Sequence, residues 1–268
     1  SGNMSFAGVN NRYNNFMIDG AANNDVFGLA SSGNNGGQAG AQPVSMETIE
    51  QIQVSVAPFD VRQSGFTGGA INAITKSGTN QFHGSAYYYG YNQDLIGTKY
   101  PYLDGTGYAP KYQKQTQYNM GVTLGGPIIK NKLFFFANYE RTNKEYPNLY
   151  GVDSGNSKVN TEQAKDILTM LQKIAEKQGV NFNDYYSNQD IYTKSDKAGL
   201  KLDWNINEFN KFAIRWSLVK AEQLSGGGSA SSLNSYGYSY PFKSNTNSFI
   251  AELQSRFSPS VSNEARVS

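Results

Sequence analysis

The stretch that decides the fold is ETIEQIQVSVAPFDVRQSGFTGGAINAITKSGTNQFHGSAYYYGY, residues 47–91. Residues 49–56 alternate in side-chain character, which predicts a strand of a small compact unit. A glycine-rich bend follows at 63–69, and AINAIT at 70–75 predicts a second strand. Residues 76–80, KSGTN, have the composition of a turn. From Phe82 onward the pattern changes to long alternating aromatic strands, and it keeps that character to the end of the chain.

The composition favours a membrane protein built from strands. The chain has 268 residues with 19 Tyr, 15 Phe and 28 Gly, and only 16% of its residues are charged. Mean hydropathy is -0.56, and no run approaches the roughly 20 apolar residues that a spanning helix needs. Many aromatics in alternating strands are typical of a membrane β-barrel, because each strand has one lipid face and one wet face. The net charge of +2, with scattered basic residues, gives no indication of nucleic-acid binding.

Residues that could carry catalysis or bind a metal are sparse. Cysteine is absent, which excludes disulfides and thiolate metal sites. His83 is the one histidine, so multi-histidine zinc sites are excluded and a histidine-based triad is disfavoured. The Gly-rich segment 65–69 lacks the Gly-Lys-Thr of a phosphate loop. The sequence therefore predicts no enzyme, no metal and no cofactor.

Six complete alternating strands and the start of another are predicted after Phe82. Each is close to the 9–11 residues with which a tilted strand crosses a bilayer. The predicted strands are 82–91, 118–125, 132–141, 196–204, 211–219 and 248–257.

The connections between these strands alternate in length. Short ones at 126–131, 205–210 and 258–263 separate long ones at 92–117, 142–195 and 220–247. Outer-membrane barrels have short periplasmic turns and long outer loops, whereas a soluble sandwich has no reason to place every long loop at one end. The sequence therefore predicts antiparallel transmembrane barrel strands with long outer loops.

Charged side chains lie on the strand face opposite the aromatic ones. A Lys or Arg at the lipid midplane costs roughly 2–4 kcal/mol, so we expect these residues to face the barrel lumen. Tyrosine and tryptophan near strand ends are expected to form the interfacial girdles of a membrane protein. The lumen candidates are His83, Lys201, Asp203, Arg215, Glu252 and Arg256, and the girdle candidates are Tyr91, Tyr118, Tyr139 and Trp204.

Three further segments carry local predictions. Residues 28–42, GLASSGNNGGQAGAQ, predict a flexible loop, with a substrate-facing loop as the alternative. Residues 44–50 predict a short helix with Ser45 as its N-cap. Residues 161–178 predict an amphipathic helix in an outer loop, ended by Gly179. Packing on neighbouring loops and a role in binding a ligand or partner both stay open for this helix.

The motifs in the deciding stretch resemble a known family. Residues 49–56, IEQIQVSV, and 68–76, GGAINAITK, resemble the end of the plug domain of TonB-dependent outer-membrane receptors, where an IExIEV strand precedes a GGxINxxTK strand. NFMIDG at 15–20 resembles a plug strand that ends in Asp-Gly. The sequences of residues 8–21 and 61–69 are most similar to those of the Oar-like branch of this family.

The resemblance implies a mostly β fold. Residues 1–80 would be the C-terminal part of the plug domain, an α+β portion, and residues 81–268 the N-terminal part of a large transmembrane β-barrel with one helix in an outer loop. Six strands cannot close a barrel of the 22-stranded class. The chain also starts without a signal peptide and ends inside a strand, so we expect a piece of a longer receptor.

The resemblance also implies which plug residues matter. Structural or gating roles fall on Asp19, Gly20, Arg62, Gly68, Gly69, Asn72, Thr75 and Lys76. Arg62 lies in the bend that packs against charged barrel residues in the family. A pair with barrel carboxylates and a solvated Arg62 both stay open.

The function implied by the resemblance is active import of a scarce nutrient across the outer membrane of a Gram-negative bacterium, with the plug gating the barrel. Implied partners are outer-membrane lipid, the TonB energy-transducing complex (through a box absent from this chain), an imported ligand and, as an open option, a surface lipoprotein. The alternative is an adhesin or structural surface protein with the same fold. The cargo stays open among iron chelates, cobalamin, glycans and peptides, because fold alone does not set function.

Overall fold

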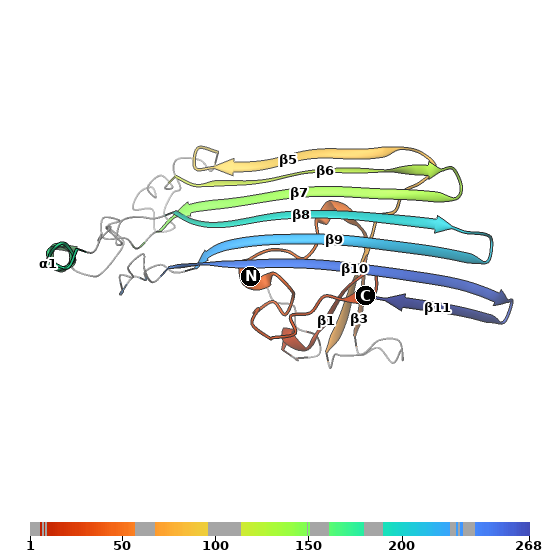
Figure 1. Ribbon diagram of the computed structural model, residues 1–268, viewed down its shortest axis with the longest axis horizontal. Coiled ribbons are helices and arrows are strands. Elements are labelled where there is room, and N and C mark those ends of the chain that lie inside the picture. The colour runs from red at the N-terminus through yellow and green to blue at the C-terminus, as the bar shows by residue number, and fades with distance from the viewer. Residues whose placement is uncertain are drawn as a thin grey trace, which may run out of the picture.

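The computed structural model describes residues 6, 8, 10–56, 68–95, 114–148, 150, 161–179, 190–225, 229, 231–232 and 239–268. These residues form two sheets: a small one of four strands in the order β2-β1-β4-β3, and a large one of seven strands in the order β11-β10-β9-β8-β7-β6-β5. The small sheet lies to one side of the long strands, nearer to the end with the short turns (Figure 1). Helix α1 lies beyond the opposite end of the long strands (Figure 1).

The small sheet contains the strands that the deciding stretch predicted. Its central strand β4 carries small and branched side chains and is mostly buried, as suits a strand covered on both faces. It pairs in parallel with β1 and antiparallel with β3. The strands are β1 (Asn15–Ile18), β2 (Ala21–Ala22), β3 (Ile49–Val56) and β4 (Gly69–Thr75).

The large sheet is an antiparallel meander in which each strand pairs with its neighbours in sequence. Within the described residues β5 and β11 are its two edges, so the sheet is a partial barrel wall that does not close. The strands are β5 (His83–Asn92), β6 (Thr116–Ile129), β7 (Leu133–Pro147), β8 (Asp190–Asn205), β9 (Asn210–Ser225), β10 (Tyr240–Ser258) and β11 (Val261–Val267).

Most of these strands are longer than the sequence predicted, and the long connections are correspondingly shorter. β8 begins at Asp190 rather than at 196, and β10 begins at Tyr240 rather than at 248. The added residues are mostly polar, and their few apolar side chains, such as Ile191, Leu224 and Phe242, do not make a regular alternation. Their backbones nevertheless keep the ladder pairing, for example Lys194 with Glu222 and Glu222 with Lys243.

The two faces of the large sheet differ as a barrel wall requires. The inward face contacts the small sheet, for example through Arg215 and Lys201. The outward face exposes large apolar side chains, among them Trp204, Trp216 and Phe249. Tyr118, Tyr139 and Trp204 lie on the outward face, as the girdle prediction required. That prediction was wrong for Tyr91, whose strand position faces inward and whose hydroxyl donates to Gln117 Oε1 at 2.8 Å.

Two of the local predictions need correction. The segment at 44–50 forms only a 3-10 turn, η3 (Met46–Thr48), and Ser45 makes no side-chain cap. Its hydroxyl donates to Glu140 across the interface instead. Residues 28–42 are not a free loop, because they contain η2 (Gly37–Ala39) and the fully buried Ala39 packs with Val219 and Ala221 of β9. A further short element, η1 (Asn11–Tyr13), precedes β1.

The predicted helix is confirmed as α1 (Thr161–Lys177). Gly179 follows in the left-handed conformation, with φ of 68°, as a helix stop requires. Part of the apolar stripe is exposed at Ile167, Leu171 and Ile174, while Ala175 is buried. In the part of the chain that the structure describes, no helix is both long and apolar enough to cross a membrane.

Gly78 joins the two sheets through a position that leaves no room for a side chain. A Cβ there would lie 2.7 Å from the backbone oxygen of Gly126 and would also meet the backbone of Phe135. We therefore expect Gly78→Ala to destabilise the protein by roughly 1–3 kcal/mol, the usual cost of overpacking. Thermal unfolding in detergent measures this. Gly90→Ala is the control, because the atoms nearest to a Cβ at Gly90 all belong to the ring of the exposed Tyr88, which can move aside. Equal losses in the two variants would contradict the prediction.

Candidate functional site

The Asp-Gly turn between β1 and β2 is tied to strand β4. Asp19 and Gly20 both have positive φ, at 48° and 77°. Their amides donate to Ala73 O at 3.0 Å and to Asn72 Oδ1 at 2.9 Å. The Asp19 carboxylate accepts from the Thr75 amide at 2.8 Å and from the Thr75 hydroxyl at 2.6 Å. Four of the plug-motif residues predicted from the sequence are thus brought together in one unit.

The same carboxylate reaches the large sheet. Arg215 of β9 is buried and its Nη1 lies 3.4 Å from Asp19 Oδ2. This is an ion-pair separation at which Nη1 lacks good hydrogen-bond geometry. Lys201 of β8 donates through Nζ to the Thr75 carbonyl at 3.2 Å. Two residues predicted to face the lumen therefore contact the hydrogen-bonded pair, Arg215 at Asp19 and Lys201 at Thr75.

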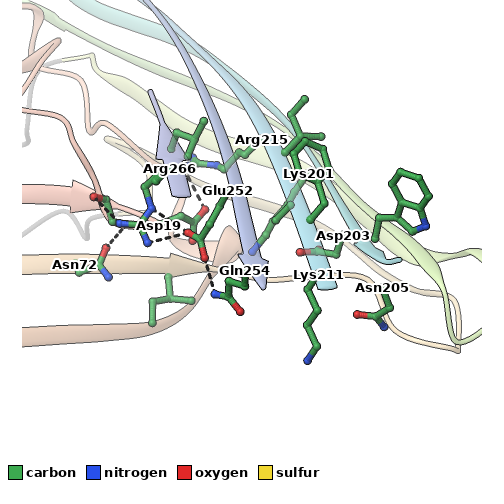
Figure 2. Close-up of a pocket in the computed structure, with 17 residues that line it drawn as sticks. Asp19, Asn72, Lys201, Asp203, Asn205, Lys211, Arg215, Glu252, Gln254 and Arg266 are labelled. Atoms are coloured by element: carbon green, nitrogen blue, oxygen red, sulfur yellow. Dashed lines mark hydrogen bonds and ion pairs between the residues drawn. The ribbon is translucent and has the colours of Figure 1, made fainter. Parts of the chain in front are cut away.

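A third contact joins Gly20 to the last strand. Arg266 of β11 donates to Gly20 O at 3.3 Å, and its Nε and Nη2 donate to Glu252 Oε2 at 2.9 and 2.7 Å (Figure 2). Glu252 was predicted to face the lumen, but Arg266 was missed. Because Arg266 stands directly opposite Glu252 in the register, pairing the last strand with its neighbour would have found it.

These contacts border a cavity of about 370 Å³ between the two sheets, near the short-turn end. Asp19, Asn72, Arg215, Glu252 and Arg266 lie along it (Figure 2), and Lys201, Asp203 and Lys211 complete its charged lining. Asp203 has one buried carboxylate oxygen, Oδ2, without a hydrogen-bond partner among the described residues. The cavity lining thus combines cations and carboxylates within one interface.

A second polar cluster joins the sheets through Glu140 of β7. Its Oε2 accepts from Ser45 Oγ at 2.7 Å and from Tyr87 Oη at 2.7 Å, and its Oε1 accepts from Lys197 Nζ at 2.6 Å. The side chains of Glu140 and Lys197 are only 4% and 8% exposed. Ser45 belongs to the segment before β3, so this buried ion pair also holds that segment against the large sheet.

The remaining predicted site residues lie elsewhere. The amide of Gly68 donates to Tyr13 O at 3.4 Å, that of Gly69 to Asn14 Oδ1 at 3.1 Å, and that of Lys76 to Thr48 O at 2.8 Å. His83 is exposed beside Gln81, and Arg256 lies over the Phe209 ring at 5.6 Å. Arg62 lies outside the described residues. Among the residues that are described, no group of three or more acidic or histidine side chains could hold a metal ion.

Sequence comparison links this geometry to known proteins. Residues 74–152 match the family model described as an outer membrane beta barrel domain. The TonB-dependent transporter Oar of Myxococcus xanthus is 34% identical over 138 residues, which is 51% of this chain and 12% of that protein. A probable TonB-dependent siderophore receptor, PirA of Acinetobacter baumannii, is 31% identical over 37% of this chain and 11% of its own length. The chain is related to the TonB-dependent outer-membrane receptors.

Structure comparison agrees on the fold. The outer membrane transporter YddB of Escherichia coli superposes with a TM-score of 0.58 at 11% identity, over 94% of this chain and 30% of that one. A mutant of the ferric enterobactin receptor PfeA of Pseudomonas aeruginosa gives 0.55 at 13% identity, over 95% of this chain and 32% of that one. The chain spans about an eighth of the curated relatives. Together the matches confirm the Oar-like resemblance and a Gram-negative outer-membrane location.

Proposed function

We propose that this chain forms part of a receptor that imports a scarce nutrient across the outer membrane with energy supplied through TonB. In this proposal residues 1–80 are the C-terminal part of the plug and residues 81–268 are the first strands of the barrel wall. The protein acts as a transporter, without catalysis. Its partners are outer-membrane lipid, the TonB complex and the imported ligand.

The observation that carries the proposal is the chemistry of the interface between the two sheets. Asp19–Arg215, Ser45–Glu140 and Gly20–Arg266 are ionic or hydrogen-bonded contacts. Polar groups can exchange such partners for water, whereas an apolar interface loses its stabilisation when it opens. A plug held by polar contacts stays bound to the barrel wall at rest and can still separate from it when TonB applies force. A purely structural or adhesive barrel has no need of a separable plug.

Energy-dependent uptake tests the proposal. Cells that express the intact receptor, and cells that lack it, are given labelled iron chelates, cobalamin, oligosaccharides or peptides, each with and without a protonophore. Iron chelates come first, because PirA is named as a siderophore receptor. We expect receptor-dependent uptake of one class that the protonophore or loss of TonB abolishes. Cell-surface binding without energy-dependent uptake of any class would favour the adhesive alternative.

A disulfide across the interface should block this uptake. A Cβ at Gly40 would lie 3.2 Å from Thr193 Cγ2 of β8, and a cysteine at 193 can place its Sγ near the position of that Cγ2, within reach of a disulfide partner. The chain has no cysteine of its own. We expect Gly40→Cys/Thr193→Cys to lose most of its energy-dependent uptake when oxidised and to recover it with reductant. Each single cysteine variant is a matched control. Full uptake by the oxidised double variant would show that this part of the plug stays in place during transport.

A further inference from the structure

The inward face of β5 carries a row of three tyrosines. Tyr87, Tyr89 and Tyr91 occupy alternate positions, so their side chains project from the same face of the strand. Tyr87 is anchored by its hydrogen bond to Glu140, and its ring centroid lies 5.5 Å from that of Tyr89. Tyr89 and Tyr91 are 63% and 41% exposed. The row therefore begins beside the contact with the small sheet and continues with two open rings toward the end of the strands beyond which α1 lies (Figure 1).

Amide and hydroxyl side chains lie beside these two rings. Gln117 and Asn119 of β6 are directly opposite Tyr91 and Tyr89, and Thr142 of β7 is opposite Asn119. The Tyr91 hydroxyl donates to Gln117 Oε1 at 2.8 Å, and the Thr142 hydroxyl donates to Asn119 Oδ1 at 3.5 Å. Each amide oxygen is thus used within the wall, while the amide nitrogens of both residues have no partner among the described residues and remain donors. We call these five side chains the tyrosine face.

The tyrosine face carries little charge. Among the described strand residues of β5, β6 and β7 that face inward between Glu140 and the α1 end, the single charged one is Lys144. Its neighbours Arg141 and Glu145 occupy outward positions of β7. Asp94 and Lys114, beside the ends of β5 and β6, have opposite signs. A strongly anionic ligand requires several cations, so this part of the wall suits a neutral one.

We propose that the tyrosine face binds a neutral oligosaccharide as the nutrient to be imported, an inference that rests on the proposed function. One face of a sugar ring consists of C–H groups, which pack on an aromatic ring, and its hydroxyl oxygens accept from amide N–H groups. Tyr89 and Tyr91 are two positions apart on β5, which places them roughly 7 Å apart along the strand. This spacing is comparable to one sugar unit, so neighbouring units of a chain reach neighbouring rings.

The same face offers less to a peptide. Extended peptides gain affinity by adding to an open sheet edge, with pockets for alternate side chains. β6 and β7 are paired on both sides, and the closure of a barrel leaves no open edge. The tyrosine face also contains no aliphatic side chain larger than threonine. Open aromatic rings beside amide donors therefore favour the saccharide.

The test measures binding to the intact receptor in mild detergent by isothermal titration calorimetry. The probes are maltohexaose, cellohexaose and chitohexaose, with a glycine–serine hexapeptide and a negatively charged ferric chelate as competing classes. We expect the receptor to bind at least one of the saccharides. Tyr89→Ala/Tyr91→Ala should weaken that binding roughly tenfold or more, because two ring contacts are lost. Tyr89→Phe/Tyr91→Phe should keep most of the affinity, since it retains both rings.

Two controls make the result specific. Tyr88→Ala removes an exposed ring from the outward face of the same strand, and Lys144→Gln removes the inward charge. Both should bind the saccharide as the wild type does. Equal weakening by Tyr88→Ala and by Tyr89→Ala/Tyr91→Ala would overturn the proposal, as would no binding of any of the three saccharides. Ring-dependent binding of the hexapeptide, or binding of the ferric chelate that Lys144→Gln weakens, would overturn it in favour of that class.

Uptake by cells separates this inference from the proposed function. Ring-dependent saccharide binding without energy-dependent uptake of the saccharide would contradict import and leave the binding site standing. Energy-dependent uptake of a peptide or an iron chelate, unchanged by Tyr89→Ala/Tyr91→Ala, would support import and overturn the saccharide site.

Discussion

Lys197→Met is expected to lower the free energy of unfolding by roughly 3–5 kcal/mol, because it leaves a buried carboxylate without its counter-charge. Glu140 is almost completely enclosed, and Lys197 is its cationic partner at 2.6 Å. Ser45 and Tyr87 would still donate to Glu140, but neutral donors do not offset a full charge removed from water. Urea or thermal unfolding of the receptor in detergent measures the loss.

The exposed pair Lys243–Glu222 provides the matched control. Lys243→Met removes the same kind of partner from a carboxylate that water can reach, so we expect a change of about 1 kcal/mol or less. Glu140→Gln combined with Lys197→Met removes both charges and keeps an acceptor for Ser45 and Tyr87. The double variant should therefore lose less stability than Lys197→Met alone. Similar losses for Lys197→Met and Lys243→Met would show that the buried pair is not the dominant contact.

The architecture could be predicted from the sequence because barrel strands have alternating apolar and polar residues. Wherever one face meets lipid, the pattern has period two, and this located all six complete strands and the start of β11. The period-two pattern did not predict the parts of the strands that extend beyond the membrane. Residues such as Lys194 and Glu222 pair in the ladder but face water, so they have no apolar contrast to read. Strand length in that region is set by backbone hydrogen bonds. These do not depend on side-chain type, so the sequence pattern does not predict where the strands end.

The interface was predictable only in part, and for a physical reason. Asp19, Gly20, Asn72 and Thr75 belong to a recognisable motif, and Arg215 and Glu252 were found by their strand face. Glu140 and Lys197 lie equally inward, but they are 57 residues apart in the sequence. Only the register of β7 with β8 places them opposite one another. That register depends on where the strands end, which the polar extensions concealed. Ser45 shows the same limit, since its partner lies across the interface.

Asp19→Ala should both destabilise the protein and loosen the proposed plug from the barrel wall. The change removes the acceptor for two Thr75 hydrogen bonds and leaves Arg215 buried without its counter-charge. We expect a loss of roughly 3–5 kcal/mol from the uncompensated cation. Alanine at a φ of 48° adds strain of roughly 1–2 kcal/mol. Unfolding in detergent measures the total, and sensitivity of cells to large antibiotics that the outer membrane normally excludes measures the seal.

Asp19→Asn separates the two effects of the change. Asparagine tolerates the left-handed conformation, and its amide oxygen can still accept from Thr75, but the charge facing Arg215 is lost. If cells with Asp19→Asn are nearly as sensitive to the antibiotic as cells with Asp19→Ala, the Asp19–Arg215 ion pair holds the proposed plug in the barrel wall. If Asp19→Ala loses stability and neither variant leaks, the motif only fastens β1 to β4, and the seal rests on the Glu140 cluster. In that case Ser45→Ala should leak, because it removes the hydrogen bond that holds the segment before β3 to Glu140.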